Sequence, residues 1–204
     1  MKLYLNDTSP FARLILICAL EYNIKEIELI WVDPWEMPTN LLAINPFSTV
    51  PVLQLDNGDV LYESSIIATY LTSNSTRHTL LEYQRFALGK MLIETAFRHV
   101  SLTRYSPENI TPHPFIARTE QVLKQALNTL SEYDLPNFSA KEAPDLASLQ
   151  LAVALDYLTF RLPNLVQSYL HPKVIERLST FQLRHSFALT TPEILRVKSR
   201  YLSK

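Results

Sequence analysis

The hydrophobic pattern changes about one third of the way along the chain. Up to about residue 75, short apolar runs typical of strands alternate with stretches of helical period, whereas the remainder has helical period throughout. Alternating strands and helices build a sheet covered by helices, and a run of helices builds a bundle. The pattern therefore predicts an α/β domain over residues 1–75, followed by an all-helical domain over residues 82–204.

The beginning of the chain predicts a β-α-β unit. Residues 2–5 and 28–32 have the character of strands, and a helix from Pro10 to about residue 22 separates them, so the two strands should be parallel. Apolar residues at helical spacing mark the face of this helix that packs on the sheet: Phe11, Leu14, Ile15, Cys18 and Tyr22. Cys18 is therefore interpreted as a core residue and not as a reactive thiol.

A hairpin and a third helix are expected next. Two strands, residues 51–55 and 60–62, flank Asn57-Gly58, a pair that favours the positive φ angles of a tight turn. Residues 64–71 then have helical spacing, and a polar linker follows. The order strand, helix, strand, short helix, strand, strand, helix is thioredoxin-like.

The second part of the chain predicts a helical bundle. Turn signals, most of them containing proline, separate four helical segments: residues 82–105, 114–133, 146–161 and 172–188. No repeat or low-complexity tract interrupts them.

Composition narrows the chemistry. Only two of the 204 residues are glycine, which excludes glycine-rich nucleotide-binding loops, and the formal charge of -1 lacks the basic footprint of a protein that binds nucleic acid or anionic membranes. One cysteine and five scattered histidines indicate no metal site, and no stretch approaches the ~20 apolar residues of a membrane span. The lone cysteine fits a reducing, cytoplasmic location.

Three blocks of sequence then carry a resemblance to a known family: residues 8–13 (TSPFAR), 45–53 (NPFSTVPVL) and 61–67 (LYESSII). In this order and spacing they resemble the bacterial glutathione transferases, and residues 155–161 and 185–188 resemble later helices of the same family. The resemblance implies a thioredoxin-like domain followed by a helical bundle. It also implies a homodimeric detoxification enzyme that takes glutathione as co-substrate and needs no cofactor.

Ser9 is the candidate catalytic residue. It precedes Pro10, which is preferred at the first helical position, so Ser9 should cap the first helix. A hydroxyl at a positive helix end can also donate to a bound sulfur and favour its thiolate. The resemblance assigns this role to Ser9, with Tyr4 as the second choice.

The resemblance also implies where glutathione binds. It places Phe11 and Thr49 at the site, makes the Val50-Pro51 bond cis, and lets the Val50 backbone pair with the cysteinyl unit. A rigid turn is an equally compatible interpretation of that bond.

Glu63 and Ser64 are candidates for binding the γ-glutamyl end of glutathione. They precede a helix whose first N–H groups attract a carboxylate, and the acid beside them can hold an ammonium. A helix cap formed by Ser64, with Glu63 as an acidic neighbour, is the simpler alternative.

The electrophile is expected to be small and hydrophobic and to bind near Phe11 and the first bundle helix. Candidate lining residues are Phe97, Leu102 and Tyr105, although core positions have the same spacing.

Two departures from the family keep a second function open. Thr49 stands where lysine, arginine or glutamine is common, and Gly89 with Lys90 stands where the first bundle helix often carries an acid that reaches the partner subunit's glutathione. The alternative is a non-enzymatic interaction module of the stringent starvation protein type. Glutaredoxin-like thiol transfer is disfavoured because Ser9, and not a cysteine, precedes Pro10.

Overall fold

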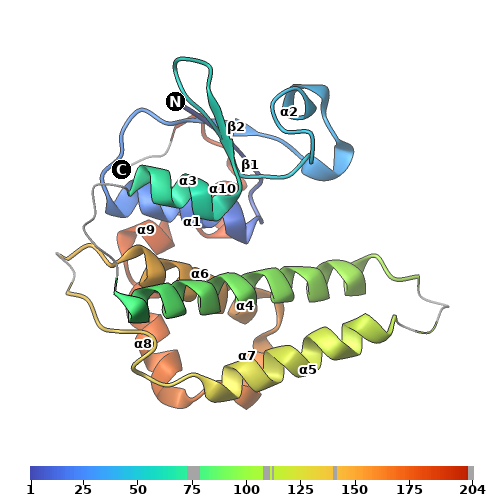
Figure 1. Cartoon of the computed structure of the whole chain (residues 1–204), viewed down its shortest axis with the longest axis vertical. Helices are drawn as coiled ribbons and strands as arrows, with labels where there is room; N and C mark the ends of the chain where they lie inside the picture. Colours follow the sequence, from blue (N-terminus) through green and yellow to red (C-terminus); the bar gives the residue numbers. More distant parts are fainter. Residues whose placement is uncertain (73–78, 108–110, 112, 140–141, 202–204) are drawn as a thin grey trace. The chain divides into compact units, whose positions relative to one another are not determined.

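A four-stranded sheet forms the centre of the first part of the chain (Figure 1). Its strands are β1 (Lys2–Leu5), β2 (Glu28–Trp31), β3 (Val52–Gln54) and β4 (Val60–Tyr62), and they lie side by side in the order β2-β1-β3-β4. β1 and β2 are parallel, whereas β3 is antiparallel to β1 and to β4. This topology confirms the thioredoxin-like prediction.

The structure is a computed structural model, and it describes residues 1–72, 79–107, 111, 113–139 and 142–201. Contacts between residues divide the chain into two compact units, which are described separately below.

Two helices of the first unit pack against each other, α1 (Pro10–Glu21) and α3 (Ser64–Leu71). Between β2 and β3 the chain forms the short helices η1 (Pro34–Glu36) and α2 (Thr39–Leu42). Cys18 in α1 is fully buried, and burial raises the pKa of its thiol to about 12. The prediction that Cys18 is a core residue is confirmed, because a thiol with this pKa stays protonated and unreactive at neutral pH.

The β3–β4 hairpin corrects one expectation. Only Gly58 has a positive φ, of 92°, whereas both Asn57 and Gly58 were expected to adopt one. The Gly58 amide donates to the Leu55 carbonyl at 3.0 Å, and the Leu55 amide donates to the Asp59 carbonyl at 2.8 Å. This is a longer loop in which a turn is followed by a left-handed glycine, and such a loop requires only one positive φ.

Five helices follow in the second part of the chain: α4 (Leu80–Arg104), α5 (Pro114–Thr129), α6 (Leu146–Arg161), α7 (Pro163–Tyr169) and α8 (Pro172–Gln182). The all-helical prediction is confirmed, but α7 was expected to be a turn. Its proline lies at the first helical position, where the missing N–H is no loss. The last predicted helix is also divided, since α8 ends at Gln182 and α9 (His185–Ala188) is separate.

The compact units do not follow the predicted boundary at residues 75–82. The first unit contains Met1–Arg77, Ala140–Leu146 and Leu183–Lys204, and the second contains His78–Ser139 and Ala147–Gln182. The end of the chain, with α9 and α10 (Pro192–Leu195), therefore belongs with the sheet and not with the bundle.

The buried Arg13 accounts for part of this grouping. From α1, its Nη2 donates to the Phe187 carbonyl of α9 and its Nε donates to Thr190 Oγ1, both at 3.3 Å. Its guanidinium also lies 5.6 Å from the centre of the Phe187 ring. These contacts tie α9 to α1.

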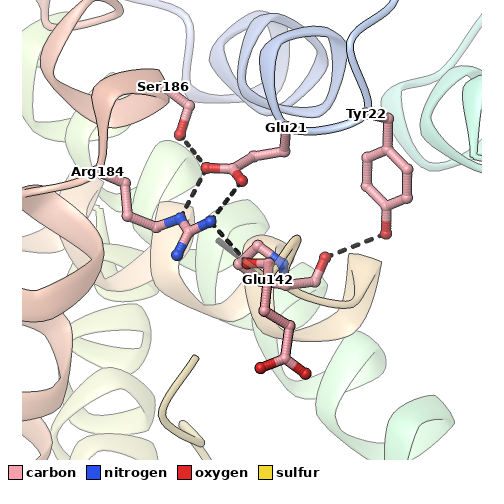
Figure 2. A network of polar contacts seen from close by, with 6 residues as sticks. Glu21, Tyr22, Glu142, Arg184 and Ser186 are labelled. Atoms are coloured by element: carbon pink, nitrogen blue, oxygen red, sulfur yellow. Dashed lines mark hydrogen bonds and ion pairs between the residues drawn. The ribbon is translucent and has the colours of Figure 1, made fainter. Parts of the chain in front are cut away.

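A second polar network ties the other end of α1 to the same unit (Figure 2). Arg184 donates to the Glu21 carboxylate and to the Glu142 carbonyl, and Ser186 donates to Glu21. Tyr22 donates to the Pro144 carbonyl at 3.1 Å. Both ends of α1 are therefore fixed by segments that lie more than a hundred residues later.

Gly89 explains how α4 packs in the second unit. A Cβ on this glycine would lie 2.7 Å from the Leu151 amide nitrogen in α6, closer than real side chains approach. The position therefore faces α6 of its own chain. Close packing against the α6 backbone leaves no room for a side chain, which accounts for a glycine at this position.

Candidate functional site

The register of the sheet brings three candidate segments to one edge. Val52 in β3 lies beside Tyr4 of β1 on one side and beside Tyr62 of β4 on the other. The chain leaves β1 towards Ser9, enters β3 from Val50 and leaves β4 towards Glu63, all at this end of the strands. Side chains separated by more than fifty residues therefore share one edge.

Ser9 is the N-cap of α1, as predicted. Its backbone is extended (φ −74°, ψ 117°), and its Oγ accepts a hydrogen bond from the Ala12 amide at 3.2 Å. Because the hydroxyl is the acceptor in this bond, its hydrogen can still be donated to a ligand. Tyr4, the second choice, directs its hydroxyl towards Gln54 Oε1 at 3.5 Å.

The buried Asn45, which the sequence analysis did not single out, organises the loop before β3. Its Nδ2 donates to the Thr49 carbonyl at 2.9 Å and to Thr49 Oγ1 at 3.0 Å, and its Oδ1 accepts from the Phe47 amide at 3.1 Å. The Asn-Pro pair that opens this loop is a turn signal that could have identified it. Thr49 is therefore held by its own loop.

Val50 presents its backbone at the end of this loop. The Val50-Pro51 bond is cis, as the resemblance implied. Within the described residues, the Val50 amide and carbonyl make no hydrogen bond. An extended peptide could pair with both groups in the manner of an added strand.

Glu63 adopts a backbone conformation that is rare for a residue other than glycine, with φ 77° and ψ 120°. Its carboxylate caps α3, because Oε1 accepts from the Ser65 amide at 3.2 Å and Oε2 accepts from the Ser65 hydroxyl at 2.5 Å. The buried Ser64 donates its hydroxyl to Glu63 Oε1 at 3.2 Å. The expectation that Ser64 caps this helix is wrong, since Glu63 occupies the cap position and Ser64 is the first helical residue.

The remaining candidates belong to different units. Phe11 lies half-buried in the first turn of α1. Phe97 and Leu102 are half-buried in α4, and Tyr105, at the end of α4, is exposed with the Arg104 guanidinium 5.6 Å from its ring centre. A role for these three side chains in binding an electrophile stays a prediction.

The part of the chain that the structure describes contains no group of three or more histidine, cysteine, aspartate or glutamate side chains arranged to hold a metal ion. Among its helices, none combines the length and the apolar character needed to cross a membrane.

Comparison with known proteins identifies the class. Residues 8–74 match the family model for the N-terminal domain of glutathione S-transferases. The matched residues include Ser9, Val50, Glu63 and the whole of α3. Residues 8–74 therefore belong to the family of glutathione S-transferase N-terminal domains, and the chain has the glutathione transferase fold.

Individual relatives match over almost the full length. The chain is 25% identical to the uncharacterized GST-like protein YibF of Escherichia coli K12, over 94% of this chain and 98% of that protein. A glutathione S-transferase of Methylobacillus flagellatus, solved with glutathione bound, is 25% identical with a TM-score of 0.79. A family member from Pseudomonas fluorescens Pf-5, also solved with glutathione, is 26% identical with a TM-score of 0.78. Both alignments cover 94% of this chain and 98% of the other.

Proposed function

We propose that this chain is a glutathione transferase that joins the glutathione thiolate to small electrophilic molecules. The observation that supports the proposal is that the segments carrying Ser9, Val50 and Glu63 all adjoin the same end of the sheet strands. Glutathione is bound in the similar proteins from M. flagellatus and P. fluorescens, which supports the choice of ligand.

Ser9 acts on the sulfur. A free thiol with a pKa of about 8.5 is mostly protonated at neutral pH, and a donated hydrogen bond at a positive helix end stabilises the thiolate. The thiolate then attacks an electrophilic carbon and forms a carbon–sulfur bond. The thiol proton passes to solvent, and a leaving group departs or, in an addition, the substrate takes up a proton. No covalent bond to the protein and no cofactor is required.

Val50 and Glu63 orient the tripeptide. The Val50 amide and carbonyl pair with the backbone of the cysteinyl unit, which places the sulfur near the start of α1. The first N–H groups of α3 and the Ser64 hydroxyl receive the γ-glutamyl carboxylate. The Glu63 carboxylate then turns from the Ser65 amide to the γ-glutamyl ammonium, so that both charged groups of the γ-glutamyl unit are matched.

The electrophile contacts apolar side chains, for which the candidates are Phe97 and Leu102 on α4 and Tyr105 directly after it. Phe11, in the first turn of α1, is the candidate in the first unit. Thr49 would contribute its hydroxyl to glutathione while Asn45 holds it.

We also propose that the protein is a homodimer. Phe47 is 70% exposed, and its ring meets the exposed Tyr62 ring edge to face with centroids 6.0 Å apart. Leu80 and Met91 on α4 are 74% and 67% exposed. Exposed aromatic and apolar side chains of this size are typical of an interface, and a two-fold symmetric dimer is the commonest assembly.

One observation favours the alternative, a non-enzymatic interaction module. Thr49 stands where the family commonly has a lysine, arginine or glutamine, and its hydroxyl already accepts from Asn45. Retention on immobilised glutathione, followed by a conjugation assay, separates the two functions. Retention with turnover supports the transferase, and the absence of both supports the interaction module.

A further inference from the structure

The outer edge of β2 is paired with a segment from near the end of the chain. In the sheet order β2-β1-β3-β4, β2 is an outer strand. The side of β2 that faces away from β1 lies against residues Ser199–Tyr201, here called the edge segment. The Leu29 amide donates to the Arg200 carbonyl at 2.8 Å, and Glu28 and Tyr201 form an isolated antiparallel bridge. The edge segment thus covers part of an edge that would otherwise expose unpaired backbone groups.

Side chains of β2 also hold the edge segment. Trp31 Nε1 donates to the Ser199 carbonyl at 2.7 Å, and Arg200 Nε donates to Glu28 Oε1 at 2.8 Å. Arg200 is 71% exposed, so its ion pair is screened by water and contributes little. The backbone bond of Leu29 and the indole bond of Trp31 are therefore the main attachments.

β2, which the edge segment holds, leads directly to the residues that support the loop before Val50. One residue after β2, the Val32 amide donates to the Leu5 carbonyl at 3.0 Å, and η1 begins at Pro34. The Pro34 carbonyl accepts a hydrogen bond from Ser48 Oγ at 3.0 Å. Ser48 has a positive φ of 48° and lies two residues before Val50. Hydrogen bonds and short chain segments therefore connect Ser199 to the Val50 loop, entirely within the first unit.

We propose that the edge segment is a strap that holds the Val50 loop in position for glutathione binding. This proposal rests on the function proposed above. When the strap is docked, the end of β2 and η1 are held where the Pro34 carbonyl can meet Ser48. When it is undocked, β2 loses its outer partner, the Ser48 bond opens more often, and the Val50 backbone is less well placed for the cysteinyl unit. The strap acts through the loop and touches no substrate.

The test compares the full chain with a variant that ends at Lys198 and with Trp31→Phe, which removes the indole donor and keeps an aromatic ring. Arg196→Ala, which removes a charge close to the strap without touching β2, is the matched control. Two quantities are measured: hydrogen exchange of amides in residues 33–50, and the dissociation constant of glutathione by calorimetry. In the shortened variant both the exchange rates and the dissociation constant should rise about fivefold, which is the effect of one net hydrogen bond. Trp31→Phe should change both in the same direction by less, and Arg196→Ala should change neither.

Faster exchange at Leu29 alone, with residues 33–50 unchanged in both variants, would overturn the proposal, because the segment would then only cover the sheet edge. Uniformly faster exchange that includes α1 would also overturn it, since the effect would be a general loss of stability. If the full chain does not bind glutathione, the function proposed above fails, but the exchange rates of residues 33–50 still decide whether the strap supports the loop.

Discussion

Arg184 and Glu21 form a two-pronged ion pair inside the first unit (Figure 2). Nε lies 2.8 Å from Oε1 and Nη2 lies 2.7 Å from Oε2, with the two side chains only 12% and 8% exposed. Burial alone would raise the pKa of Glu21, but the hydrogen bonds from Arg184 and Ser186 outweigh it and hold the pKa below its ordinary value. The pair fixes the C-terminal end of α1.

Glu21→Gln should therefore destabilise the protein by roughly 3 kcal/mol at pH 7, because it leaves a buried guanidinium without its counter-charge. A lowered pKa in the folded state means that this stabilisation is fully present above the ordinary pKa of a glutamate. It is lost as the pH falls through the lower pKa of the folded protein. Urea unfolding from pH 7 to pH 3 should show the gap between wild type and variant closing in acid. Glu132→Gln, which breaks an exposed ion pair with Lys173, should stay close to wild type, and an equal effect of both variants would contradict this account.

Gly89→Ala should destabilise the second unit, because the new Cβ would lie 2.7 Å from the Leu151 amide nitrogen. An overpacked contact against backbone costs about 1–3 kcal/mol, since neither helix can move without disturbing its own packing. Thermal melts measure this. Gly58→Ala is the comparison, because a Cβ there meets nothing within 4 Å and only the φ of 92° opposes it. A Gly89→Ala variant as stable as wild type would show that α4 and α6 are not this close.

The first 71 residues were largely predictable, and the reason is local. The short apolar runs of β1 and β2, the helical spacing in α1 and the Ser9-Pro10 cap signal each depend on neighbours along the chain. The sequence did not reveal that Glu63 caps α3 or that it has a positive φ. The Glu63 carboxylate and the Ser64 hydroxyl are both plausible caps when only the sequence is known.

The features that the sequence did not predict depend on contacts between residues far apart in the chain. The grouping of α9 with the sheet rests on a bond between Arg13 and Phe187, which are 174 positions apart. Likewise, a proline can end one helix or begin the next. The sequence analysis interpreted Pro163 as part of a turn, whereas it is the first residue of α7. The shared site edge follows from the pairing of Val52 with Tyr4 and Tyr62, and a register of this kind is fixed only when the whole sheet forms.

Ser9→Ala should lower the conjugation rate at saturating glutathione by about 10- to 150-fold, the effect of losing one charge-assisted hydrogen bond. Alanine also removes the helix cap, so Ser9→Gly serves as a second variant that loses the hydroxyl with little loss of capping. Both variants should lose activity, whereas only Ser9→Ala should melt clearly earlier. A normal rate in both, with a loss in Tyr4→Phe, would transfer the role to Tyr4.

The oligomeric state tests the proposed interface. Sedimentation at micromolar concentration should give a species of twice 23.5 kDa. Phe47→Glu should weaken the association, because it places a charge where an exposed aromatic ring would be buried. A single 23.5 kDa species for the wild type would reject the homodimer.

Glu63→Gln should weaken glutathione binding about tenfold, through loss of the charged partner of the γ-glutamyl ammonium. It should also lower the Tm, because Glu63 caps α3. Ser64→Ala removes a hydroxyl but keeps the cap, so it should weaken binding with a smaller effect on the Tm. Calorimetry and thermal melts of both variants separate binding from capping. Unchanged affinity in Glu63→Gln would rule out the proposed contact with the ammonium.

The most direct test of the account is titration of the wild-type chain with glutathione and with Cys-Gly, which lacks the γ-glutamyl unit, followed by a conjugation assay with 1-chloro-2,4-dinitrobenzene. The account predicts saturable binding of glutathione with a dissociation constant below about 1 mM, much weaker binding of Cys-Gly, and conjugation faster than the uncatalysed reaction. Equal binding of the two peptides would contradict the γ-glutamyl site. No binding of glutathione and no conjugation would contradict the transferase itself.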